Sequence, residues 1–279
     1  MQLDLLPVRT AGAAENMAAD FLLLQRYPEP THARFRHYDW RGPAFTFGYS
    51  QKITYVREQL ANILSSGVER VVPNALSVDI TRRPTGGGVV DHRDDWTFAL
   101  VIPRGHALYD ARATESYRQV HADLVAALRA QGQPVILKET CDSGSECRSL
   151  LAGESGVDIR PANKPSPASK LLHSKPPAPG PTVCFIRPEL YDVVHADTGA
   201  KVAGAAQKRT KHGLLFQGSI AKSVLGAEVD WDAFEAAFIA RLATTFSAEV
   251  MPAPWPDFAE GEHDGLTEQY SAPEWIEYR

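Results

Sequence analysis

The sequence predicts a domain of mixed structure, in the α/β or α+β class. Short β-rich runs alternate with runs of helical periodicity, and we find no internal repeat. The 279 residues, 44% of them hydrophobic, are enough to bury one sizeable core. We therefore expect a single domain over residues 1–279, with its core at about residues 28–245.

The first half of the chain is expected to combine five strands with two helices. The strands are expected at residues 3–8, 33–38, 43–49, 77–82 and 96–102, and the helices at residues 14–26 and 57–64. Further along, residues 189–194 and 201–206 are expected to pair as a hairpin. Its turn is expected at Asp197-Thr198-Gly199, where glycine permits a tight reversal.

Two later helices carry the clearest periodic signals. Apolar residues recur at helical spacing over residues 113–131, and Gly132 supplies a stop. A second helix should begin near Asp230, where Asp232 and Glu235 have the spacing of a capping box. We expect the apolar stripe of each helix to face the core.

Charge and composition exclude several classes of protein. A formal net charge of -5 leaves no basic excess to release counterions, so we expect no nucleic-acid partner. No apolar run approaches the ~20 residues that span a bilayer, and residues 1–4 lack the charged start of a signal peptide. The three cysteines are an odd number and form no complete disulfide framework. We therefore expect a cytoplasmic protein without membrane contact.

Residues 141–183 differ from the rest of the chain in composition. This segment is rich in proline, with scattered lysine and serine. It cannot bury enough apolar surface to offset the conformational entropy lost on ordering. We expect a flexible insertion, of the kind that serves as a lid or linker. Cys141 and Cys147 lie in it without a histidine at metal-ligand spacing, so we expect no metal site.

A glycine turn follows the strand expected at residues 77–82, and it reads Arg82-Arg83-Pro84-Thr85-Gly86-Gly87-Gly88. Three glycines allow positive φ and a close approach of the backbone to a ligand. Exposed N–H groups in such a turn can hold a carboxylate, carbonyl or phosphate oxygen, and the arginines add fork-shaped donors. A tight hairpin beside a solvated charge pair is the alternative, and the glycines alone fit it equally well.

Read as a whole, residues 82–92 resemble the signature Arg-Arg-x-x-Gly-Gly-Gly-x-Val-x-His of the lipoate–protein ligase and octanoyltransferase family. Residues 201–209, Lys-Val-Ala-Gly-Ala-Ala-Gln-Lys-Arg, are similar to its second signature. Residues 14–20 look like its first-helix motif, and residues 270–275 look like its terminal helix. The resemblance covers nearly the whole chain outside the insertion. It implies an α+β fold, in which a mixed sheet is flanked by helices and a second, smaller sheet lies beside it.

The order Cys184-Phe185, Tyr191-Asp192, Lys201 is similar to that of the cysteine-dependent octanoyltransferases. The resemblance implies that Cys184 carries an acyl thioester. It also implies that Lys201 favours the nucleophilic thiolate and contacts the acyl carbonyl. By the same resemblance, acyl or substrate binding is expected at Arg82, Arg83, Gly86, Gly87, Gly88, His92, Gly204, Gln207 and Gly218.

Two features stay open at this point. Gln217 stands where the cysteine-dependent enzymes usually have a histidine, and an amide cannot exchange protons as imidazole does. Trp40, Phe45, Phe47 and Tyr49 could line an acyl tunnel, but their alternation along a strand is equally typical of core packing.

The leading hypothesis is an octanoyl (or lipoyl) transferase that needs no cofactor. It would take the group from acyl carrier protein and pass it to a lysine of a lipoyl domain or glycine cleavage H protein. The first alternative is an ATP-dependent lipoate–protein ligase, which requires ATP and Mg and forms lipoyl-AMP. The second alternative is a non-catalytic relative that binds acyl groups or carrier domains.

Overall fold

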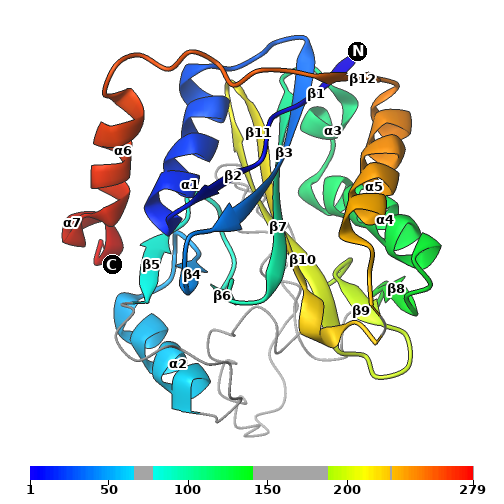
Figure 1. Ribbon diagram of the computed structural model, residues 1–279, viewed down its shortest axis with the longest axis horizontal. Coiled ribbons are helices and arrows are strands. Elements are labelled where there is room, and N and C mark those ends of the chain that lie inside the picture. The colour runs from blue at the N-terminus through cyan, green and yellow to red at the C-terminus, as the bar shows by residue number, and fades with distance from the viewer. Residues whose placement is uncertain (66–77, 141–187, 227, 279) are drawn as a thin grey trace, which may run out of the picture.

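The computed structural model describes residues 1–65, 78–140, 188–226 and 228–278 (Figure 1). The expected insertion at residues 141–183 lies outside the described residues, as do Cys141, Cys147 and Cys184.

A nine-stranded mixed sheet forms the centre of the molecule. Eight strands follow the order β12-β1-β3-β7-β11-β10-β9-β8, and β2 pairs with β3 off this path. β1 is parallel to both β3 and β12, whereas the run from β3 to β8 is antiparallel. The strands are β1 (Gln2–Leu5), β2 (Arg9–Ala11), β3 (His32–Trp40), β7 (Asp95–Pro103), β8 (Val135–Leu137), β9 (Val193–His195), β10 (Lys201–Thr210), β11 (Gly213–Ala221) and β12 (Glu249–Pro252).

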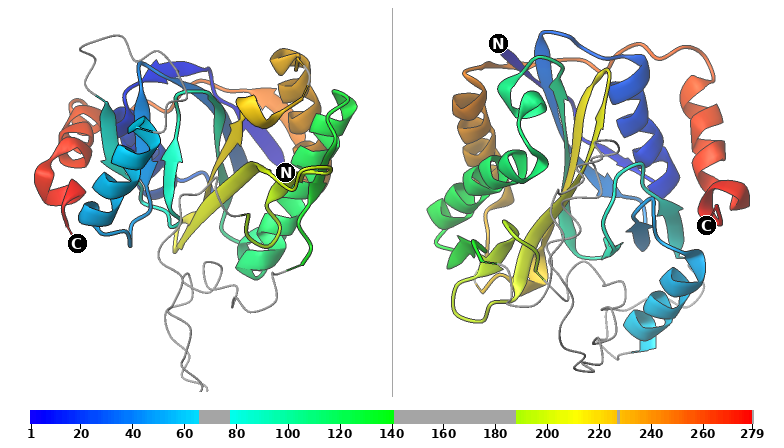
Figure 2. Two further views of the ribbon diagram at one scale, coloured as in Figure 1. Left: turned by 90° about the horizontal axis from the view of Figure 1, so that it is seen from below. Right: turned by 180° about the vertical axis from the view of Figure 1, so that it is seen from behind.

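Helices cover both faces of this sheet (Figures 1 and 2). On one face lie α3 (Ala107–Asp110), α4 (Ala113–Ala130) and α5 (Trp231–Phe246), and the 3-10 helix η3 (Lys222–Val224) follows β11. Aromatic side chains dominate the core beneath α5, where Trp96 and Phe98 of β7 pack against Phe238. These rings bury large apolar areas, so this layer is the main hydrophobic core.

The opposite face is covered by α1 (Ala13–Phe21), which continues as the π-helical turn η1 (Leu22–Arg26). Helices α6 (Glu262–Ser271) and α7 (Pro273–Ile276) lie outside α1 (Figure 1). Tyr270 of α6 is buried in the cluster that contains Met17 of α1. The C-terminal helices therefore form an outer layer on this side of the molecule.

A second sheet of three strands lies beside α1, in the order β5-β4-β6. Its strands are β5 (Asp79–Arg82), β4 (Ala44–Phe47) and β6 (Val89–Asp91), and α2 (Ile53–Ser65) packs on it. The glycine turn connects β5 to β6. The α+β class, with a mixed sheet and a smaller second sheet, is confirmed.

Most predicted elements are confirmed, and several of their boundaries are corrected. The helix expected at residues 57–64 begins at Ile53. The strand expected at residues 3–8 ends at Leu5. The cap of α5 is Asp230, whose carboxylate accepts a hydrogen bond from Ala233 N at 3.0 Å, so the capping box at Asp232 is wrong. The hairpin forms with its turn at Gly199 in positive φ, but its first strand begins only at Val193.

Candidate functional site

A narrow cavity of about 50 Å³ lies between the two sheets. Its floor is a row across four strands of the large sheet, in which Gly204 pairs with Ser219, Ser219 with Thr97, and Thr97 with Tyr38. The first three side chains of this row are small, so they leave a trough that ends at the Tyr38 ring. The walls come from α1, β4, the glycine turn and the end of β6, with Met17, Thr46, Arg83, Gly87, Val90 and His92.

Lys201 brings a buried positive charge to this cavity. Its Nζ lies 2.7 Å from Asp192 Oδ2, and the two side chains are only 7% and 8% exposed. The same carboxylate oxygen accepts a hydrogen bond from Glu189 N at 2.6 Å. Removing two charges from water is costly unless they are paired and hydrogen-bonded, as these are. Asp192 therefore balances the charge of the Lys201 ammonium inside the protein.

Gly204 makes room for that ammonium. A Cβ on Gly204 would lie 2.6 Å from both Cε and Nζ of Lys201, closer than real Cβ atoms approach. The register between β10 and β9 shifts between Lys201 and Ala203, which marks a bulge at this point. The lysine side chain therefore lies over the strand, above the glycine three residues further on. This packing explains why the second signature needs both residues.

Arg83 ties the glycine turn to the cavity wall. Its guanidinium donates to the carbonyls of Gly86 and Gly88 at 2.7 and 3.0 Å, and to Thr46 Oγ1 at 2.8 Å. Gly87 has φ 89°, which a residue with a side chain rarely adopts. Sequence reasoning missed Gly48, where a Cβ would lie 2.1 Å from Gly87 O. The backbones at Gly48 and Gly87 are therefore in direct contact beside the cavity.

Arg82, expected to bind substrate, lies outside the cavity lining and is fully buried. Its guanidinium donates to the carbonyls of Tyr49 and Gln51 at 2.7 and 2.8 Å. It also donates to those of Trp275 and Ile276, at 3.0 and 2.7 Å. Because its donors serve the main chain, the geometry gives Arg82 the role of an anchor between the glycine turn and the C-terminal helices.

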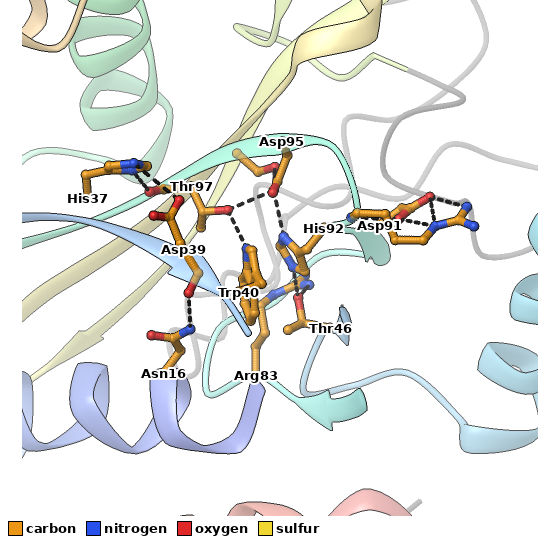
Figure 3. A network of polar contacts seen from close by, with 12 residues as sticks. Asn16, His37, Asp39, Trp40, Thr46, Arg83, Asp91, His92, Asp95 and Thr97 are labelled. Carbon is orange, nitrogen blue, oxygen red and sulfur yellow. Dashed lines mark hydrogen bonds and ion pairs between the residues drawn. The ribbon is translucent and has the colours of Figure 1, made fainter. Parts of the chain in front are cut away.

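His92 is held on both ring nitrogens (Figure 3). Nδ1 lies 2.7 Å from Asp95 Oδ2, and Nε2 lies 2.7 Å from Thr46 Oγ1. Since Thr46 Oγ1 already accepts from Arg83, its own proton can go to Nε2, which leaves the ring proton on Nδ1 facing Asp95. The ring stacks on Trp40 with centroids 4.0 Å apart. His92 is therefore fixed as part of the wall.

Asp95 is the common acceptor at this end of the cavity, and sequence reasoning missed it. Besides His92, both Thr97 Oγ1, at 2.8 Å, and Ser219 Oγ donate to its Oδ2. Thr97 in turn accepts from Trp40 Nε1 at 2.9 Å (Figure 3). The indole that closes the trough is thus fixed by one hydrogen bond and one stacking contact. An aspartate three residues after the signature histidine, at the start of a strand, was the available signal.

Gln217 joins three parts of the site. Its Oε1 accepts from Thr85 Oγ1 at 2.7 Å, and its Nε2 donates to Asp20 Oδ2 at 2.6 Å. Asp20 is fully buried and pairs with Arg36 at 2.8 Å. Burial raises the pKa of the Asp20 carboxyl, and Arg36 opposes this shift. An amide supplies an acceptor and a donor at once, so Gln217 connects the glycine turn to α1 without a titrating group.

Of the other residues expected to bind substrate, some line the cavity and others lie outside it. Gly218 lines it through its backbone, and a Cβ there would lie 2.2 Å from the Phe98 ring. Gln207 does not line it; its Oε1 accepts from Ser116 Oγ of α4 at 3.0 Å. Gly86 and Gly88 are also absent from the lining. Cys184 lies outside the described residues, so its expected role stays a prediction.

Of the four aromatic residues that could line a tunnel, only Trp40 does so. Phe45 and Phe47 are fully buried in the cluster beneath α2. Thr46 between them faces the cavity, because neighbouring residues of a strand point to opposite faces. Tyr49 contacts the Trp275 ring at 6.0 Å between centroids. For Phe45 and Phe47 the alternation is therefore core packing.

Within the described ranges, no three or more His, Cys, Asp or Glu side chains are grouped so that they could hold a metal ion. Among the helices described, none combines the length and apolar character needed to cross a membrane.

Residues 12–238 match the family model of the lipoyl protein ligase A/B catalytic domain. The chain belongs to this family. The match includes the glycine turn, Lys201, Gly204 and every strand that contributes to the cavity floor. The resemblance of the two signatures is thereby confirmed at the level of the family.

Curated relatives in the lipoyl protein ligase A/B family include the octanoyltransferase LipM of Geobacillus kaustophilus, which is 28% identical over 210 residues. That match covers 74% of this chain and 60% of the relative. The LipM of Halalkalibacterium halodurans is 30% identical over 210 residues, covering 74% of this chain and 61% of the relative. The chain spans about three fifths of the length of these curated relatives.

Solved structures of the same fold include a lipoate-protein ligase A bound with ATP. It has a TM-score of 0.61 at 16% identity and covers 99% of both chains. A bi-partite lipoate protein ligase from Thermoplasma acidophilum, studied with its E2 lipoyl domain, has a TM-score of 0.60 at 17% identity. That match covers 99% of this chain and 96% of the other. These similarities establish the fold.

Proposed function

We propose that the chain transfers an octanoyl (or lipoyl) group from acyl carrier protein to a lysine of a lipoyl domain or glycine cleavage H protein. Its curated relatives are octanoyltransferases, which favours this reaction over adenylate chemistry. The proposed transfer requires no cofactor, whereas the alternative ligase reaction requires ATP and Mg.

The observation that carries the proposal is the trough that runs from Lys201 to the Tyr38 and Trp40 rings. Three strand spacings separate Gly204 from Tyr38, which is about 14 Å. An extended eight-carbon chain matches this length, with its carbonyl near the Lys201 ammonium and its methyl end toward the aromatic rings, and the cavity of about 50 Å³ must widen to admit it. Ligand sites of this kind combine apolar walls with few, well-placed polar groups.

The proposed chemistry has two exchanges. In the first, the Cys184 thiolate attacks the carrier thioester, the acyl group moves to the Cys184 sulfur, and the carrier thiolate leaves and takes up a proton. In the second, an unprotonated acceptor amine attacks the Cys184 thioester, which forms an amide, releases the Cys184 thiolate and gives up one amine proton to solvent. A negative charge develops on the carbonyl oxygen in both steps. We assign its stabilisation to the Lys201 ammonium, which Asp192 holds in place.

His92 has no assigned proton transfer in this scheme. Both of its ring nitrogens are engaged by Thr46 and Asp95, so it supports the wall that Trp40 completes. Gln217 likewise serves the scaffold, since its amide connects Thr85 to Asp20.

The test compares two acyl donors with one acceptor, an unmodified lipoyl domain. The enzyme is incubated with octanoyl-acyl carrier protein alone and, separately, with octanoate plus ATP and Mg. We expect acceptor acylation in the first reaction without ATP. Acylation only in the second reaction would replace the transferase by the ligase. Acylation in neither, while octanoyl-carrier protein still binds, would favour the non-catalytic relative.

A further inference from the structure

Tyr191, directly before the partner of Lys201, has an unusual backbone conformation. Its φ is 65°, in the left-handed region that bulky residues rarely occupy. Among the described residues, Ser247 is the other non-glycine residue with positive φ. Ser247 closes helix α5, where such a conformation is common. Tyr191 closes no helix; it is the third residue of a turn in which Asp192 N donates to Glu189 O at 3.1 Å, a position that normally favours glycine when φ is positive.

Besides this turn and the bond from Glu189 N to Asp192 Oδ2, three hydrogen bonds hold Tyr191 and its neighbour in place. Tyr191 N donates to Lys138 O at 2.7 Å, and Lys138 N donates to Asp192 O at 2.9 Å. The Tyr191 carbonyl faces His121 of α4, whose Nδ1 lies 2.6 Å from the oxygen. The first two bonds extend the pairing of β8 and β9. The third comes from a different layer, and it is the one made by a side chain.

His121 has the properties of a dedicated donor. The residue is 1% exposed, and burial lowers the pKa of its imidazole, so the ring is neutral near pH 7. A neutral ring that donates from Nδ1 leaves Nε2 as an acceptor, and Nε2 is buried without a hydrogen-bond partner among the described residues. Burying an imidazole removes a polar group from water, which costs free energy for a residue that only fills space.

We propose that His121 is a positioning residue: it holds Tyr191 in the left-handed conformation and thereby keeps Asp192 against Lys201. This inference rests on the function proposed above, because it gives the Asp192–Lys201 pair its purpose in catalysis. The path runs from α4 through one carbonyl to the carboxylate that holds the ammonium at 2.7 Å. His121 is absent from the cavity lining, and its hydrogen bond goes to the carbonyl directly before Asp192, so it acts through Asp192.

Three variants distinguish a positioning role of His121 from a role in core packing alone. His121→Leu fills the space without a donor. His121→Asn keeps an N–H where Nδ1 stood. Tyr191→Gly removes the steric penalty for positive φ, so its backbone no longer depends on the His121 bond. Thermal unfolding is recorded for each variant, so that loss of folding is recognised.

The first readout is octanoyl transfer with the full chain. We expect His121→Leu to lower kcat about tenfold with KM within about twofold, because fewer molecules hold Asp192 in place. His121→Asn should recover most of kcat. In the Tyr191→Gly background, adding His121→Leu should lower kcat by less than about threefold. An equal loss in both backgrounds, or no rescue by asparagine, would overturn the proposal.

The second readout needs no turnover, so it separates this proposal from the proposed function. Amines are labelled with a water-soluble acylating reagent, and Lys201 is followed by peptide mass spectrometry, with exposed Lys211 as the internal standard. We expect His121→Leu to raise the Lys201 labelling rate several-fold, since the amine is no longer held by Asp192. An unchanged rate in a folded His121→Leu protein would overturn the proposal, even if octanoyl transfer is confirmed. If wild-type protein transfers nothing, the proposed function fails while this readout still stands.

Discussion

Single residues set the position of the charge in the cavity, and the pair Lys201 and Gly204 shows how. The glycine contributes by having no side chain, since a Cβ would occupy the space of Nζ and Cε. The lysine contributes a charge that Asp192 keeps buried. The position of the ammonium depends on both residues. A sequence signature that contains both therefore predicts the charged site.

Gly204→Ala should lower kcat for octanoyl transfer by at least about tenfold. The added methyl group displaces the Lys201 ammonium, and each 1.4 kcal/mol of lost transition-state stabilisation costs tenfold in rate. Gly42→Ala is the matched control, because a Cβ at Gly42 meets nothing within 4 Å. Steady-state kinetics of both variants check this expectation, and equal activity of the two would contradict it.

Asp192→Ala should lower the free energy of unfolding by about 3 kcal/mol, since it leaves the Lys201 charge in a buried site without its carboxylate. The control is Arg118→Ala. Its ion pair with Glu115 has a similar distance, 2.6 Å, but the two side chains are 46% and 47% exposed. Removing that exposed pair should cost less than about 1 kcal/mol. Urea unfolding measures the free energy of unfolding of both variants. Similar decreases in the two would show that burial does not determine the contribution of these ion pairs to stability.

Whole elements give the cavity its length and its closed end. Strands β10, β11 and β7 each contribute a small residue to one row, and β3 ends that row with an aromatic ring. Trp40, two residues after Tyr38, is held by Thr97 and stacks on His92. The trough is therefore open along the small residues and closed by a fixed indole.

Trp40→Ala should shift acyl-chain preference toward longer donors. Removing the indole extends the cavity past its closed end, so decanoyl transfer relative to octanoyl transfer should rise about tenfold, within the 10–200-fold range that hydrophobic pockets reach per group. A chain-length series of acyl-carrier substrates measures this ratio. If the variant keeps the wild-type ratio, the acyl chain does not end at Trp40.

The sequence predicted the elements with strong local signals and missed those that depend on distant partners. The helix expected at residues 113–131 forms at Ala113–Ala130, because its apolar periodicity is local. Strand β12 was missed, since it exists through pairing with β1 at the other end of the chain. The site shows the same limit. Arg82 and Arg83 look alike in sequence, yet their guanidinium groups serve the C-terminal carbonyls and the glycine turn respectively.

At the scale of the whole molecule, buried polar groups connect the layers around the cavity. Arg82 connects the small sheet to α7, Gln217 connects the large sheet to α1, and His121 connects α4 to the loop before β9. Each connection crosses from one layer to another. The stability of the fold and the geometry of the site therefore depend on some of the same hydrogen bonds.

Stability should fall as pH falls below 6.5, in part through His121. Burial lowers its pKa in the folded state below the ordinary value of 6.5. The unfolded chain therefore binds the proton more readily, and stability is lost as pH falls through the unfolded value. One such group contributes up to about 1.4 kcal/mol per pH unit below that value. Urea unfolding between pH 5 and 7 should show a steeper decline for wild type than for His121→Asn, and equal slopes would contradict this assignment.

The most direct test of the thioester mechanism is the intact mass of the protein after brief incubation with octanoyl-acyl carrier protein, without ATP or acceptor. We expect a mass increase of one octanoyl group that maps to Cys184, disappears when the lipoyl domain is added, and is absent in Cys184→Ser. We also expect Lys201→Met to form this adduct much more slowly. A Cys184→Ser protein that still acylates the lipoyl domain at the wild-type rate would contradict the thioester mechanism.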